Sequence, residues 1–491
     1  MGIIKQQSIQ NSVITYLGIL LGFISTLYLY PNILTTDQYG LTRILLSVAF
    51  ICTEFTHLGV KNIAIKFFPE FENKERKHNG FLFLLLVIPL AGFLLFLAFL
   101  FSFDDWLIRK YTSDSPLFGE FYLYLIPLVI GILYFDVINS YIRANYDSVP
   151  GSIVNEIMLR FAAIVLLVLM NFGIIDFQIF MAGFAASYLL QPVLLVLYLF
   201  RSGDLYLKPN LEFLNSKLIR RISNYGFFVL LGGVSHLIVS NIDILMLGSL
   251  SGLTDTAVYT IAFYIGSVIV VPQKSIGKIA PSLISKHISE DNIYEVEKIY
   301  KGSSLNQLVA GCLIYIGVWA NIDNLIAILP EAYAGAKWVV IIIGASKLID
   351  MAGGVNGNII MNSPFYKFNL MATSVLIVFS VFLNFLLIPE YGITGAAIAT
   401  AISLLIYNLV KGIYVWYRYR IQPLSPQLLI LFILSAAILF LSMQISTIGG
   451  IYIDIMIRSF TISAIYIPLV ISLNVSGEVN IIWQNIRKRF F

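Results

Sequence analysis

The sequence predicts an all-α polytopic membrane protein with about fourteen transmembrane helices. Its residues are 58% hydrophobic and only 12% charged, and its mean hydropathy is +0.86. Soluble domains carry about 25% charged residues. Apolar windows of about 20 residues, long enough to cross the hydrocarbon core as helices, recur along the whole chain. We expect no soluble domain between them.

Apolar runs between polar breaks place the helices in order. The first run follows Lys5 and lacks the small-residue cleavage site of a secretory signal, so we expect it to be retained as a helix. By the length criterion, the predicted spans start near Ser12, Leu41, Gly80, Phe121, Ser152, Phe177, Tyr225, Thr256, Gly302, Lys337, Tyr366, Ile393, Gln427 and Ile451.

The distribution of basic residues predicts that both termini are cytoplasmic. With the N-terminus inside, most of the 31 Lys and Arg residues fall in inner loops and tails, and only Arg109, Lys110 and Lys337 fall in outer loops. This is the positive-inside pattern. Omitting one helix would invert every later loop, so the pattern favours an even number of spans. We expect the basic inner segments to lie along anionic membrane lipids, and the alternative is a surface that docks a partner.

Two similar segments suggest an internal repeat. Thr36-Asp37 and Thr254-Asp255 each precede a new span by a few residues. Aligning them predicts two six-helix lobes of one orientation, related by an axis along the membrane normal. The predicted parts are an N-terminal lobe (1–200), a cytoplasmic linker (201–224), a C-terminal lobe (225–425), helices 13 and 14 (426–472) and a cytoplasmic tail (473–491).

Small residues cluster in the segment "LLIPEYGITGAAIATAIS", which begins at Leu386. Pro389 and Gly392 interrupt the helical pattern, and Gly395 opens a run rich in alanine. Small residues let helices approach closely in lipid. The segment therefore predicts a break followed by tight helix packing.

The longer stretch "LNFLLIPEYGITGAAIATAIS" also resembles a signature of the Wzx-type oligosaccharide flippases of the multidrug/oligosaccharidyl-lipid/polysaccharide (MOP) exporter superfamily. "TTDQYGLTRILLSV", "NIDILMLGSLSGLTDTAVYTIAF" and "LPEAYAGAKWVVIIIGAS" resemble that family at matching positions, so the similarity runs along nearly the whole chain.

This resemblance implies a transporter, not an enzyme, in the bacterial cytoplasmic (inner) membrane. Its two lobes would enclose a cavity open to one side at a time, with helices 13 and 14 outside the lobes. Its substrate would be a polyprenyl-pyrophosphate-linked oligosaccharide for O-antigen- or capsule-type surface polysaccharide, and other polysaccharide-assembly proteins are further candidate partners. No cofactor is implied, but related exporters couple transport to H⁺ or Na⁺ entry.

Basic residues inside spans are the candidates for pyrophosphate binding, since intramembrane charges usually face a cavity or a partner and guanidinium groups bind phosphate oxygens in a fork. Arg160 and Lys347 lie nearest mid-span, one in each predicted lobe. Arg43 and Lys274 lie nearer span ends, where they could instead snorkel to the interface. All four are candidates.

Local ion pairing is the alternative for several of these cations. Glu156 precedes Arg160 by four residues, Lys347 precedes Asp350 by three, and Asp454 precedes Arg458 by four. These are the spacings of neighbours on a helix. We expect Arg458, outside the predicted lobes, to be paired.

The candidates for ion coupling are Glu54, His57, Asp136, Glu156 and Asp243. Titratable groups in a low-dielectric cavity can exchange protons near neutral pH. The alternative is a buried structural hydrogen bond or ion pair. His57, one turn after Glu54, fits a partner of that carboxylate better than a separate proton relay.

Several function classes find no support. The sequence contains no Walker motif for ATP, no metal-ligand spacing or catalytic triad in polar context, and no basic stripe for nucleic acid. Two alternatives stay open. One is an ion-coupled multidrug or organic-cation antiporter of the same superfamily. The other, weaker because the outer loops are short, is a membrane-embedded glycan polymerase or glycosyltransferase.

Overall fold

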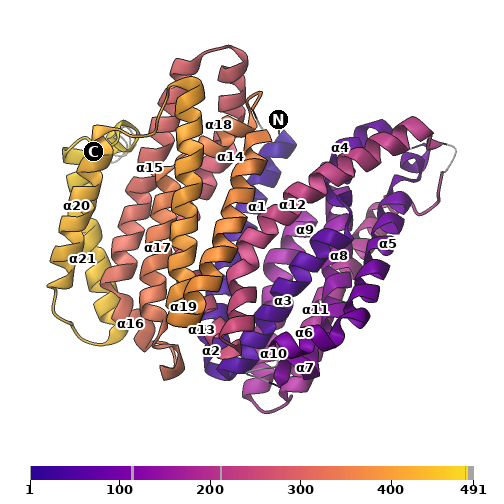
Figure 1. The fold of residues 1–491 in the computed structure, drawn as a ribbon, viewed down its shortest axis with the longest axis horizontal. Helices are drawn as coiled ribbons and strands as arrows, with labels where there is room; N and C mark the ends of the chain where they lie inside the picture. The colour runs from indigo at the N-terminus through magenta and orange to yellow at the C-terminus, as the bar shows by residue number, and fades with distance from the viewer. Residues whose placement is uncertain are drawn as a thin grey trace. The chain divides into compact units, whose positions relative to one another are not determined.

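The computed structural model describes residues 2–73, 75–111, 116–210, 213–365, 367–480 and 483–484, without the side chains at 2–6, 8–9, 12, 110–111, 228, 231–239, 274–279 and 282. The described chain consists of helices and short connections, without strands, which confirms the all-α prediction (Figure 1). It divides into two compact units, Met1–Ala257 and Val258–Phe491.

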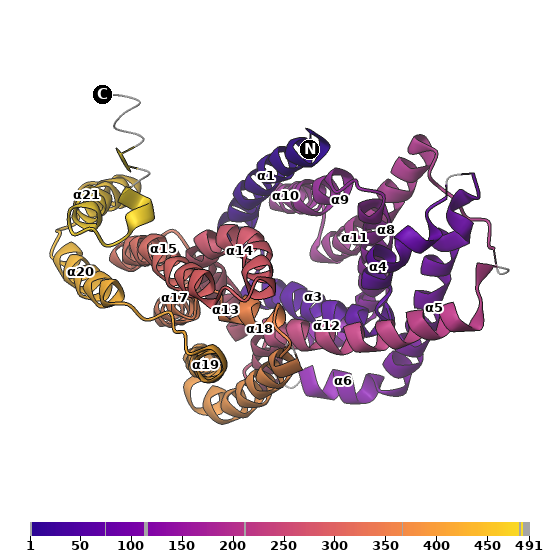
Figure 2. The ribbon, with the colours of Figure 1, turned by 90° about the horizontal axis from the view of Figure 1, so that it is seen from above.

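The first unit is built around one central helix. α8 packs against α3, α4 and α11, and its inward residues join the aromatic side chains of α4 and α5 in a buried cluster. α1 lies beside α9 and α10 (Figure 2). The main helices are α1 (Gly2–Phe23), α2 (Tyr30–Ile33), α3 (Thr36–Thr56), α4 (Val60–Phe71), α5 (Phe81–Ser102), α6 (Asp104–Tyr111), α7 (Leu117–Phe121), α8 (Leu125–Ala144), α9 (Val149–Ile153), α10 (Leu159–Asn171), α11 (Phe177–Ser202) and α12 (Ser216–Leu250).

A local sequence signal accounts for the start of α3. The Thr35 hydroxyl accepts a hydrogen bond from the Gln38 amide, and the Gln38 side chain accepts one from the Thr35 amide, which forms a capping box. Two segments are π-helical. Ile24–Leu29 connects α1 to α2, and Val154–Met158 connects α9 to α10. Such turns occur frequently at functional sites.

The second unit is organised around α15, which packs against α14, α17, α20 and α21. A buried cluster with Cys312, Leu431 and Tyr466 joins α15, α17, α20 and α21. The helices are α13 (Leu253–Ser267, which begins in the first unit), α14 (Val271–Ser289), α15 (Ile293–Ala320), α16 (Ile322–Ala327), α17 (Ala336–Ala352), α18 (Asn356–Met361), α19 (Lys367–Tyr419), α20 (Pro426–Met443) and α21 (Ile451–Ser472).

α19 is a helical hairpin rather than one continuous rod. Gly392 has φ +53° and ψ −132°, which breaks the helix. A Cβ atom on Gly395 would lie 2.2 Å from the carbonyl oxygen of Leu387, so the two arms nearly touch at the turn. Ala396 and Ala397 are fully buried in the second arm. The predicted break and close packing are therefore confirmed.

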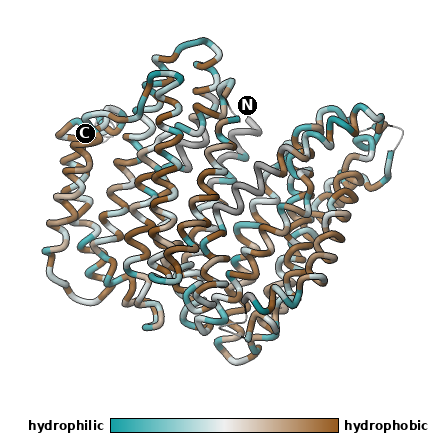
Figure 3. Tube along the Cα trace, in the orientation of Figure 1, coloured by the Kyte–Doolittle hydropathy of each residue, from teal (hydrophilic) through white to brown (hydrophobic). Residues whose placement is uncertain are grey.

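A helix is present at every predicted span. Eleven described helical stretches are long and apolar enough to cross a membrane. One of them, α19, contains the two spans predicted from Tyr366 and Ile393. The spans predicted from Tyr225 and Lys337 correspond to α12 and α17. Hydrophobic residues dominate the long helices, and hydrophilic ones gather at their ends (Figure 3). The number of membrane crossings and their orientation stay predictions.

The boundary between the compact units lies between Ala257 and Val258, whereas the repeat predicts a C-terminal lobe that begins at residue 225. α12, predicted to open the C-terminal lobe, packs along α3 in the first unit. Leu205 and Leu214 of the predicted linker pack against the core of that unit. The repeated motifs themselves meet there, since the Thr254 hydroxyl donates a hydrogen bond to Asp37. The six-helix lobe boundaries stay a prediction.

Candidate functional site

Arg43 on α3 lies in an aromatic cage. Its guanidinium carbon is 4.9 Å from the ring centroid of Tyr30 and 4.8 Å from that of Tyr39. Its Nε is shielded from solvent and has no hydrogen-bond partner. No described carboxylate lies within ion-pair distance of Arg43. The guanidinium thus lies against two rings within the helix bundle, where cation–π contact stabilises it.

Arg160 forms the predicted local ion pair. Its Nη2 lies 2.9 Å from the Glu156 carboxylate, and both side chains are partly exposed. Its Nη1 is buried without a hydrogen-bond partner. Gly18 on α1 makes room for this pair, because a Cβ there would lie 2.7 Å from Nη1. Pairing is therefore confirmed, and one nitrogen remains to donate to an anion.

Lys347 does not form the local pair with Asp350. The Asp350 carboxylate accepts hydrogen bonds from Asn408 at 2.9 Å and from Gln273 at 3.0 Å. The Lys347 ammonium lies 4.8 Å from the ring centroid of Phe263. The predicted Lys347–Asp350 pair was wrong. Neutral donors on α19 and α14 bind the Asp350 carboxylate instead.

The acidic cluster at the end of α3 does assemble. The Glu54 carboxylate, 2% exposed, accepts a hydrogen bond from the Lys61 ammonium at 2.6 Å. Nε2 of the buried His57 ring lies 3.1 Å from the same oxygen, although its N–H is not aimed along that line. Nδ1 accepts from the Gly59 amide. The ring proton is therefore assigned to Nε2, and His57 is a partner of Glu54, as predicted.

The structure places two of the remaining three candidate residues. Asp136 on α8 interacts electrostatically with Glu54, His57 and Lys61, so we group it with them. Asp243 is buried on α12, and its role stays a prediction. The side chain of Lys274 lies outside the described part of the structure.

Three residues that complete these sites were missed in the sequence. Tyr39 precedes Arg43 by four residues, so helical spacing alone could have found it. Lys61 follows Glu54 by seven residues across the left-handed turn at Gly59, and Tyr30 precedes the break between α2 and α3. Neither of these two has a local signal.

Arg458 forms the structural pair expected of it. Its Nε donates to Asp454 at 2.7 Å, and both side chains are buried. Asn324 on α16 donates to the same carboxylate at 2.6 Å. The pair therefore fixes α21 against its neighbour.

Comparison with known families decides the assignment. A family model described as "Polysaccharide biosynthesis protein" matches residues 4–281, more than half of the 491 residues. The chain belongs to this family. A curated relative, "Probable low-salt glycan biosynthesis flippase Agl15" of Haloferax volcanii, is 20% identical over 201 residues, which cover 40% of this chain and 42% of that protein. The match thus spans less than half of the relative.

Solved structures agree on the fold. The chain resembles "Lipid II flippase MurJ, inward closed conformation", with a TM-score of 0.71 and 13% identity, over 93% of this chain and 98% of that one. It also resembles an inward-facing multidrug resistance MATE family transporter of the MOP superfamily, with a TM-score of 0.65 and 14% identity, over 84% and 98% of the two chains. This polysaccharide biosynthesis family member is therefore a multi-pass membrane protein with the fold of these transporters, and the predicted family resemblance is confirmed.

Proposed function

We propose that this protein moves a polyprenyl-pyrophosphate-linked oligosaccharide from the inner to the outer leaflet of a bacterial cytoplasmic membrane by alternating access, for surface polysaccharide biosynthesis. Family membership supports the glycan substrate, and the MOP fold supports transport. The relative from Haloferax volcanii is itself named a glycan biosynthesis flippase.

The observation that carries the proposal is the cation at Arg43. A pyrophosphate that crosses about 30 Å of hydrocarbon needs cations in place of water. Arg43 has no described carboxylate within ion-pair distance, and aromatic rings hold its guanidinium. An aromatic cage leaves guanidinium N–H groups available for phosphate oxygens. Arg160 and Lys347 are the secondary pyrophosphate candidates.

We propose that the coupling ion binds at the cluster of Glu54, His57, Lys61 and Asp136. Glu54 is held by Lys61, whereas its second oxygen is buried without a hydrogen-bond partner. Asp136 of α8 interacts electrostatically with this carboxylate. Binding or release of H⁺ or Na⁺ there would change the charge between α3 and α8, and such a change can bias a conformational equilibrium.

The test measures polyprenyl-linked glycan on the cytoplasmic leaflet of cells that lack this protein. Loss of the protein should cause the glycan to accumulate, and the intact gene should restore surface polysaccharide. Arg43→Ala should fail to restore it, and Arg43→Lys should restore it in part, because an ammonium keeps the charge without the planar fork. Arg109→Ala, at a largely exposed side chain, is the matched control and should restore it fully.

Asp136→Asn in the same cells separates coupling from binding. We expect it to retain glycan binding by the purified protein but to lose surface polysaccharide. Normal glycan in cells lacking the protein, together with new sensitivity to cationic drugs, would instead identify an antiporter. Full rescue by Arg43→Ala would remove Arg43 from the substrate site.

A further inference from the structure

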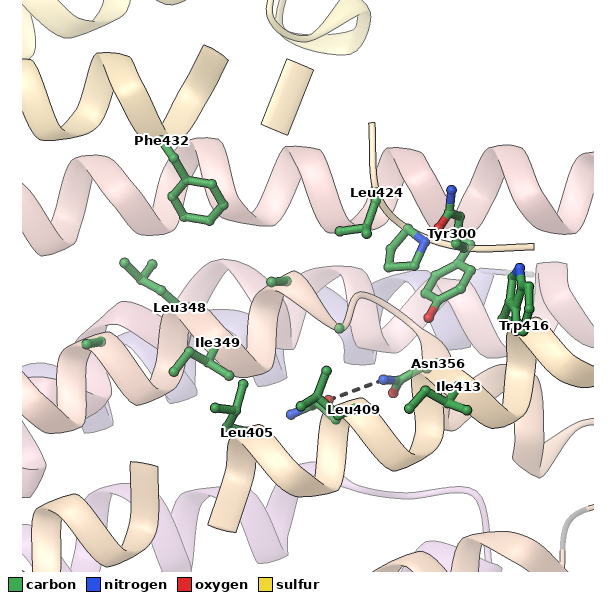
Figure 4. A pocket seen from close by; sticks show the side chains of 17 residues that line it. Tyr300, Leu348, Ile349, Asn356, Leu405, Leu409, Ile413, Trp416, Leu424 and Phe432 are labelled. Carbon is green, nitrogen blue, oxygen red and sulfur yellow. Dashed lines mark hydrogen bonds between the residues drawn. The ribbon is translucent and has the colours of Figure 1, made fainter. Parts of the chain in front are cut away.

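The second unit contains an elongated groove that the transport proposal does not use. It has a volume of about 590 Å³, within the roughly 300–1,000 Å³ of ligand sites. Aliphatic side chains of α17 and the second arm of α19 form its walls, and Phe432 of α20 and Leu424 of the preceding loop cover it (Figure 4). The lining lies entirely within the described residues.

A buried hydroxyl without a hydrogen-bond partner lines this apolar groove. Tyr300 on α15 is completely buried, and its hydroxyl has no hydrogen-bond partner. Figure 4 shows its side chain directed between Leu424 and Asn356. Asn356 itself is satisfied, since it donates to Asn408 at 3.2 Å. A buried hydroxyl without a partner costs free energy, so an acceptor oxygen on an occupant of the groove would stabilise it.

An aromatic and a basic side chain lie at one end of the groove. Trp416 lines one end and is 48% exposed. The guanidinium carbon of Arg420 lies 5.1 Å from the Trp416 ring centroid. No described carboxylate is within ion-pair distance of Arg420. Aromatic and basic side chains at a helix end mark the headgroup region, and basic pockets between spanning helices bind anionic headgroups.

The length of the groove fits one leaflet. Its wall on α19 runs from Leu405 to Trp416, which is about 16 Å at about 1.5 Å per residue. Half of a hydrocarbon core of about 30 Å is about 15 Å. An acyl chain of an ordinary phospholipid matches this length, whereas a long polyprenyl chain exceeds it.

We propose that this groove binds one acyl chain of an anionic glycerophospholipid, with the headgroup phosphate at Arg420 and an ester oxygen accepting from the Tyr300 hydroxyl. The lipid is a bound membrane component rather than the transported substrate. The proposal does not depend on flippase activity.

The test is native mass spectrometry of the full-length protein in detergent, with phosphatidylglycerol and phosphatidylcholine of matched chains as probes. The wild type should bind one phosphatidylglycerol in preference to phosphatidylcholine. Gly412→Phe should abolish this binding, because Gly412 lines the groove and a Cβ there meets open space. Gly317→Phe is the matched control, since a Cβ on this glycine of α15 also meets open space and lies outside the groove.

Arg420→Gln tests the headgroup separately. It should weaken the preference for phosphatidylglycerol about fivefold, the effect of one basic side chain near a charged headgroup. Unchanged phosphatidylglycerol binding in Gly412→Phe would overturn the groove assignment. An unchanged lipid preference in Arg420→Gln would overturn the headgroup assignment. One-for-one displacement of phosphatidylglycerol by undecaprenyl phosphate would show that the groove serves a polyprenyl chain, which also overturns the proposal.

Discussion

The turn of α19 allows a sharp test of close packing in this family member. Gly395→Ala would place a Cβ atom 2.2 Å from the Leu387 carbonyl oxygen and 3.1 Å from the Ile388 nitrogen. Both are backbone atoms, so relief requires the two arms of the hairpin to separate. Overpacking of this kind costs about 1–3 kcal/mol. We therefore expect Gly395→Ala to lower the free energy of unfolding by that amount.

Gly412→Ala in the same helix is the matched control. A Cβ atom at Gly412 meets no heavy atom within 4 Å, and alanine favours an α-helix over glycine by about 1 kcal/mol. The same substitution should thus stabilise the protein at position 412 and destabilise it at position 395. Unfolding of the purified protein by SDS, followed by circular dichroism, measures both effects. Equal changes of the same sign would refute the packing argument.

Two further predictions concern contacts within single units. Gly40→Ala should lower the Tm in detergent, because its Cβ would lie 2.0 Å from the Leu253 carbonyl oxygen; an unchanged Tm would contradict the described contact between the repeated motifs. Asp454→Leu should destabilise the protein by leaving the buried Arg458 guanidinium without its carboxylate, and Asp454→Leu/Arg458→Leu should recover part of the loss. SDS unfolding checks the pair, and a double variant no more stable than Asp454→Leu would contradict this reading.

The positions of the helices and the all-α fold class could be predicted from the sequence. Spanning length and apolar composition act within one segment, so a helix is found wherever a span was predicted. The break at Gly392 and the burial of Ala396 were also readable, because glycine and alanine have local steric consequences. By contrast, α12 joins the first unit through its packing on α3, and packing between distant segments leaves no local signal.

The candidate site was only partly predictable for the same reason. Pairs on one helix, such as Glu156 with Arg160 and Asp454 with Arg458, follow from spacing and do form. The Lys347–Asp350 pair fails because Asn408 of another helix occupies the carboxylate. Helical spacing lists which neighbours a charge can reach, but it cannot rank them against donors from other helices.

Three arginines within predicted spans differ in how far a carboxylate neutralises their charge. This difference separates their expected roles better than their depth along a span does. Arg458 and Asp454 are both buried and joined, which suits a structural tie between helices. Arg160 shares its charge with Glu156 but keeps one nitrogen without a partner. Arg43, nearer the end of its span, has aromatic rings instead of a described carboxylate. On this argument an incoming phosphate would meet the least neutralised charge at Arg43, so we propose Arg43 ahead of Arg160 as the first pyrophosphate contact to test.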